Sequence, residues 1–134
     1  MPKTARGLIL AYFWISLGGL LLHIRLHPPL ENIYNWAPTA VAALNTFVLP
    51  FMFARPSTAA WAWLAAVATV IFGSVGMAWH WLVAWPGPWN LDAFLLRSTL
   101  PDIVILWGKL PLAWAIVRLV RPHEETRGRT RCET

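Results

Sequence analysis

The chain has 134 residues, enough for one domain, and a formal net charge of +5. Hydrophobic residues make up 57% of the sequence and charged residues 13%, whereas soluble domains carry about 25% charged residues. This composition excludes a soluble domain with polar helix faces and predicts an integral membrane protein. The single cysteine, Cys132, excludes a disulfide framework within the chain.

The first predicted helix covers residues 5–27. Lys3 and Arg6 precede its apolar run, an arrangement also found at the start of signal peptides. The run continues to His23 and Arg25 without a small-residue cleavage site, so we expect an uncleaved membrane anchor. A Pro-Pro pair then ends the helix, since a residue before proline disfavours helical geometry.

The second predicted helix covers residues 36–54. Asn35 is its expected N-cap, and Pro38 falls in the first turn, where proline is tolerated. Pro50 is expected to bend the last turn, because it has no N–H to donate to the preceding turn.

The third predicted helix, residues 57–85, is the longest apolar run. It contains no acidic residue, lysine or arginine, and Ser57 is its expected N-cap. About 20 residues at 1.5 Å each cross the hydrocarbon core of a bilayer, so this run is long enough to span it.

The fourth predicted helix covers residues 99–120, and Pro111 should kink it near Lys109. The sequence therefore predicts an all-α integral membrane protein, a four-helix transmembrane bundle over residues 1–120. Residues 121–134 carry no apolar pattern and are expected to form a basic, flexible cytoplasmic tail.

The distribution of lysine and arginine predicts the orientation of the bundle. With four spans, eight of these residues fall on the side of both termini, and two, Arg25 and Arg97, fall on the other side. The positive-inside rule then places both termini in the cytoplasm of a cell, as expected of a multi-pass protein of the inner (cytoplasmic) membrane. The positive charge follows membrane topology, so no nucleic-acid partner is predicted.

This topology gathers polar residues near the opposite, outer face. The group comprises His23, His27 and His80, together with Arg97 and Asp102. Gly19 precedes His23 by four residues and Gly76 precedes His80 by four, so each glycine lies on the same helix face as a histidine.

Two histidines on facing helices, with glycine beneath a flat ring, are the residues that bind haem b in helical bundles. The cofactor-binding candidates are therefore His80, His23 and His27, with Gly19 and Gly76 as the space and Arg97 as a partner for propionates. The alternative interpretation is that the small residues serve only in helix–helix packing and that the histidines lie at the membrane–water interface without a ligand.

A metal site is the alternative use of the same histidines. His23 and His27 are spaced i and i+4, which allows two imidazoles to chelate one ion, and His80 or Asp102 could complete a zinc or copper site. The sequence contains no CxxC pair to support it.

Lys109 lies about ten residues into the fourth helix, near the middle of the membrane. An intramembrane cation is costly, so it suggests a function by default. Asp102 and Lys109 are candidates for proton transfer, and Lys109 could also contact a quinone head group, with Asn45 as a possible partner. Pairing with a carboxylate of another subunit is the structural alternative.

Three functions follow from these residues. The first is a small membrane protein that binds haem b or a quinone in electron transfer. The second is a non-catalytic accessory subunit that packs, within the lipid bilayer, against a larger membrane complex or another copy of itself. A metal-binding or transport role is the third and weakest. No motif in the sequence identifies an enzymatic reaction.

Overall fold

The structure is a computed structural model that describes residues 1–30, 35–79 and 99–121. All of its regular elements are helices. They are α1 (Lys3–Leu26), α2 (Trp36–Phe47), α3 (Leu49–Phe53), α4 (Pro56–Trp79) and α5 (Thr99–Val120).

Four helical segments are long and apolar enough to cross a membrane. They are Lys3–Leu26, Trp36–Phe53 (α2 and α3 together), Pro56–Gly76 and Ile103–Val120. These segments confirm the predicted all-α fold with four membrane-length helices. The predicted bounds of the fourth helix agree with α5, whereas the last six residues predicted for the third helix, 80–85, lie outside the described residues.

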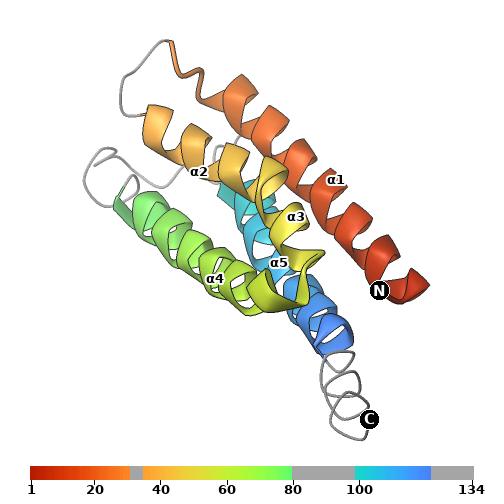
Figure 1. Ribbon diagram of the computed structural model, residues 1–134. Helices are drawn as coiled ribbons and strands as arrows, with labels where there is room; N and C mark the ends of the chain where they lie inside the picture. The colour runs from red at the N-terminus through yellow and green to blue at the C-terminus, as the bar shows by residue number, and fades with distance from the viewer. Residues whose placement is uncertain (31–34, 80–98, 122–134) are drawn as a thin grey trace, which may run out of the picture.

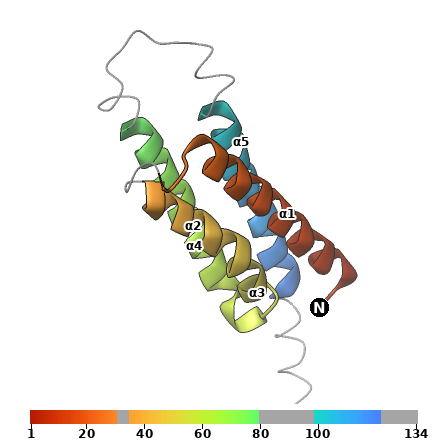
Figure 2. The ribbon, with the colours of Figure 1, turned by 90° about the horizontal axis from the view of Figure 1, so that it is seen from above.

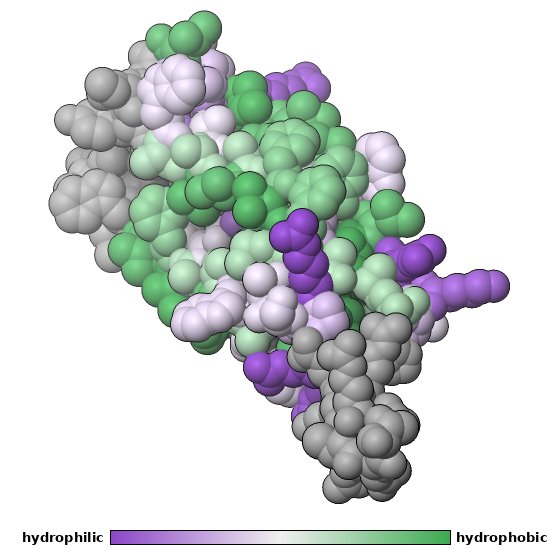
Figure 3. Space-filling view, viewed as in Figure 1, coloured by the Kyte–Doolittle hydropathy of each residue, from purple (hydrophilic) through white to green (hydrophobic). Residues whose placement is uncertain are grey.

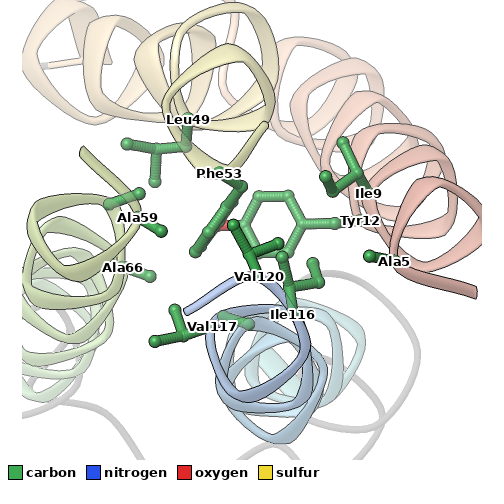
Figure 4. Close-up of a cluster of buried hydrophobic side chains, with 12 residues drawn as sticks. Ala5, Ile9, Tyr12, Leu49, Phe53, Ala59, Ala66, Ile116, Val117 and Val120 are labelled. Carbon is green, nitrogen blue, oxygen red and sulfur yellow. The ribbon is translucent and has the colours of Figure 1, made fainter. Parts of the chain in front are cut away.

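The spans form a bundle of antiparallel neighbours (Figures 1 and 2). A view down the bundle places α1 and α4 on opposite sides of the core, with α2 and α3 above and α5 below (Figure 4). The N-terminus lies near the end of α5 (Figure 1). We call this end the basic end, because it carries Lys3, Arg6, Arg55, Arg118 and Arg121. The opposite end carries His23 and His27 and is called the histidine end.

The residues of the apolar core come mainly from the parts of the helices toward the basic end, and Figure 4 shows their side chains. Small alanines of α4 allow the neighbouring helices to approach the aromatic pair Tyr12 and Phe53, whose ring centroids are 5.1 Å apart. The cluster consists of Ala5, Ile9, Tyr12, Leu49, Phe53, Ala59, Ala62, Ala66, Ala113, Ile116, Val117 and Val120.

The second span is interrupted where a bend was predicted. The helix breaks at Val48, whose φ of −106° separates α2 from α3. Pro50 explains the break, because it cannot donate a hydrogen bond to the carbonyl of Thr46. Pro111, by contrast, lies inside a continuous α5.

Of the two predicted helix caps, Asn35 does occupy the N-cap position of α2 but without a capping bond, and the cap predicted at Ser57 is wrong. Asn35 makes no capping bond; its Nδ2 donates to the carbonyl of Pro28 at 3.1 Å and ties the start of α2 to the end of α1. Ser57 lies inside α4, and the neighbouring Thr58 donates to the carbonyl of Met52 at 2.7 Å. The Met52 carbonyl also accepts a hydrogen bond from the N–H of Arg55 at 3.3 Å, so Thr58 adds a second donor at the end of α3.

The surface agrees with a membrane environment. Apolar side chains cover the middle of the visible face, and hydrophilic side chains gather mainly toward the basic end (Figure 3). Large exposed residues such as Trp14, Phe51, Trp61 and Val75 would be costly in water, whereas in lipid they face a matching solvent.

Candidate functional site: a polar half of the bundle

The two halves of the bundle differ in how their interiors are filled. Ser16 of α1 and Lys109 of α5 mark the boundary, and we call the part from these residues to the histidine end the histidine half. Beyond this level, Leu20 is the one buried side chain among those the structure describes. None of residues 35–44, the start of α2, is buried. Among the described residues, fully buried side chains are therefore concentrated in the half toward the basic end.

Lys109 is buried in the bundle interior, with only 7% of its surface exposed. It shares one stripe of α5 with the buried residues Ala113, Ile116 and Val120. Asp102 is the one acidic residue within the described ranges, and it lies two turns away, about 10 Å along the helix. Burial also argues against the alternative that Lys109 pairs with another subunit.

Ser16 lies at the level of Lys109. The Cβ position of Gly19 meets Ile105 Cγ2, so these two residues lie at the same level. Because α1 and α5 run antiparallel, Ser16 lies three residues from Gly19 toward the basic end and Lys109 lies four residues from Ile105 in the same direction. Ser16 and Lys109 are therefore at about the same level. Ser16 is 2% exposed, and its Oγ has no hydrogen-bond partner among the described residues. A buried serine hydroxyl and a buried lysine residue thus lie at one level of the interior.

A hydrogen-bonded chain closes this level toward the basic end. The hydroxyl of Tyr12 donates to Asn45 Oδ1 at 2.9 Å, and Asn45 Nδ2 donates to Thr69 Oγ1 at 2.8 Å. Asn45 Nδ2 also reaches the carbonyl of Val41 at 3.0 Å. Asn45, predicted as a possible partner of Lys109, is therefore used to join α1, α2 and α4.

His23 and His27 lie one turn apart at the histidine end. Their ring centroids are 5.3 Å apart, and both side chains are half-buried. His23 Nε2 is enclosed and has no hydrogen-bond partner within the described part of the chain. An enclosed imidazole nitrogen of this kind is available to a ligand or a metal.

The glycines of α1 and α4 differ in how closely a neighbouring helix approaches them. A Cβ at Gly19 would lie 2.9 Å from Ile105 Cγ2, and one at Gly73 would lie 2.7 Å from Leu106 Cδ2. Both glycines therefore let α5 approach α1 and α4 closely, and side chains of α5 fill the gaps. At Gly76, which is exposed, a Cβ would meet no atom of the described residues within 4 Å.

Several predicted site residues lie outside the described residues. These are His80 and Arg97, and the side chain of Asp102 is likewise not described. Among the residues that are described, no group of three His, Cys, Asp or Glu side chains gathers as a metal site. A ligand shared by His23 and His80 depends on α1 and α4 being adjacent, but in the structure they lie diagonally across the core and each packs mainly against other helices (Figure 4).

The sequence predicted that Lys109 lies within the membrane, but it did not predict that Ser16 lies at the same level. It also missed Ser74, whose buried Oγ has no partner in the described part of the structure. The available signal was weak: serine is common at helix–helix contacts in membranes, where it packs as a small residue. Comparison with known protein families, with curated proteins and with solved structures found no match to this chain.

Proposed function

We propose that this chain binds the head group of a membrane quinone in its histidine half, as a small component of membrane electron transfer. The observation that carries the proposal is the buried Lys109 at the level of the unpartnered Ser16 hydroxyl. A buried cation without a counter-charge is costly, so a ligand that accepts its hydrogen bonds offsets that cost.

The chemistry of a quinone fits these donors. Its carbonyl oxygens accept hydrogen bonds from an amine and a hydroxyl, and negative charge develops on them when electrons arrive. A fixed cation in a low-dielectric site stabilises such developing charge. The apolar tail of a quinone partitions into lipid, and the partly exposed start of α2 is the proposed point of entry from the bilayer.

The histidines extend this proposal toward the water. His23 lies seven residues from Ser16 on α1, about 10 Å closer to the histidine end. An imidazole at that depth is suited to carry protons between an enclosed quinone and the membrane surface. Asp102 is the second candidate carrier.

The proposal also covers the membrane in which the protein lies and the partner that supplies electrons. The lysine and arginine distribution favours the cytoplasmic membrane with both termini in the cytoplasm. Electrons would come from a larger membrane complex or another redox subunit, which is the partner that this function requires.

Quinone titration tests the proposal directly. A short-chain quinone is titrated into the protein in lipid nanodiscs, and the quenching of tryptophan fluorescence is followed. We expect saturable binding, weakened about tenfold or more by Lys109→Met, since a hydrogen bond to a charged group contributes about 1.5–3 kcal/mol. Lys3→Met removes an exposed lysine of the basic end and serves as the control. Equal binding by the Lys109 and Lys3 variants would contradict the proposal.

Haem b is the second candidate ligand, favoured by the enclosed and unpartnered His23 Nε2. Ligation by His23 and His80 predicts a Soret band that shifts on reduction and is lost in His23→Ala. A flat spectrum from protein produced with haem available removes this candidate and leaves the quinone proposal standing.

A further inference from the structure

The seam between α4 and α5 at the basic end combines aromatic and cationic side chains. The Arg118 guanidinium carbon lies 4.8 Å from the centroid of the Trp114 ring, a cation–π contact. Trp114 in turn packs against Trp63 of α4, with ring centroids 5.4 Å apart. The guanidinium of Arg118 thus lies against an aromatic stack that joins α4 and α5.

Arg121 adds a second cation on the same face of α5. Trp114, Arg118 and Arg121 are spaced i, i+4 and i+7, which places them on one face of α5. Although α5 ends at Val120, the N–H of Arg121 still donates to the carbonyl of Val117 at 3.1 Å, so Arg121 keeps helical register. Both arginines are exposed.

Among the described residues, the charged side chains at this end are all positive. Lys3, Arg6, Arg55, Arg118 and Arg121 are all exposed there, and within the described ranges the one acidic residue, Asp102, lies at the opposite end. The two arginines on the α4–α5 seam thus face outward without a protein carboxylate among the residues that the structure describes.

We propose that Arg118 and Arg121, with Trp114 and Trp63, form a binding site for an anionic phospholipid at the basic end. The guanidinium groups bind the lipid phosphate, because their donors match phosphate oxygens geometrically. The indole rings lie next to the glycerol and upper acyl chain, the depth that tryptophan favours in bilayers. This site is separate from the histidine half and does not depend on the proposed quinone.

Native mass spectrometry of the detergent-purified full chain tests this site. Phosphatidylglycerol or phosphatidylcholine is added, and bound lipids are counted. We expect selective retention of phosphatidylglycerol that falls about fivefold in Arg118→Gln. Trp114→Leu keeps the charge but removes the stack, and we expect it to weaken retention as well.

Arg6→Gln is the matched control, because it removes one charge from the same end on a different helix. The site predicts near-normal lipid retention in this variant. Equal losses in Arg6→Gln and Arg118→Gln would show diffuse attraction to the basic end and overturn the proposal. Equal retention of phosphatidylcholine, or displacement of the lipid by inorganic phosphate alone, would also overturn it.

Discussion

Polar residues inside the bundle differ in whether they form hydrogen bonds between helices. Asn45 uses both ends of its amide, accepting from Tyr12 and donating to Thr69, and so links three helices. The Ser16 hydroxyl has no such partner among the described residues, and Lys109 is buried at the same level. The sequence could identify Lys109 as an anomaly, because one lysine in an apolar run is visible without a structure. It could not show that Asn45 is already occupied, since that depends on which helices meet.

We expect Asn45→Leu to destabilise the bundle by about 1–2 kcal/mol, because it removes two interhelical hydrogen bonds inside the membrane. Unfolding in detergent, followed by circular dichroism, measures the effect. Thr46→Val is the matched control, since the buried Thr46 hydroxyl bonds only to Ala42 of its own helix. Equal stability of the two variants would mean that the Tyr12–Asn45–Thr69 chain adds nothing.

Whole helices were largely predictable because prolines and apolar run lengths mark their limits. The predicted start of α2 at Trp36 and both ends of α5 are confirmed. The division at Val48 was predicted only as a bend, because the response to Pro50 depends on how the following turn packs. The sequence could not predict which glycines allow close helix contact, because that depends on which side chain of a neighbouring helix faces each glycine.

Two glycines on α4 give a prediction about helix packing. Gly73→Leu should destabilise the bundle by about 1–3 kcal/mol, because the new side chain meets Leu106. Gly76→Leu should leave stability unchanged or raise it, since Gly76 faces open space and leucine favours helix. Thermal unfolding of both variants in the same detergent checks this. A larger loss at Gly76 than at Gly73 would contradict the packing of α4 against α5.

Across the whole molecule, the bundle joins a packed apolar half to a polar half. The sequence did not reveal this division, because helices that face lipid are apolar nearly all round and carry little periodic signal of their neighbours. The diagonal relation of α1 and α4 across the core became visible only in the fold (Figure 4). The division matters for function, because the polar half holds the buried polar atoms that have no hydrogen-bond partner among the described residues.

Infrared difference spectroscopy of bound quinone tests the central claim, that Lys109 binds a quinone carbonyl inside the histidine half. A quinone labelled with ¹³C at its carbonyls is bound to the protein in nanodiscs, and the C=O stretch is compared with that of the same quinone in empty nanodiscs. The proposal predicts a downshifted C=O band, caused by hydrogen bonding to Lys109, that returns to the free position in Lys109→Met. A band at the free position in the wild-type protein, or a downshift that persists in Lys109→Met, would contradict it.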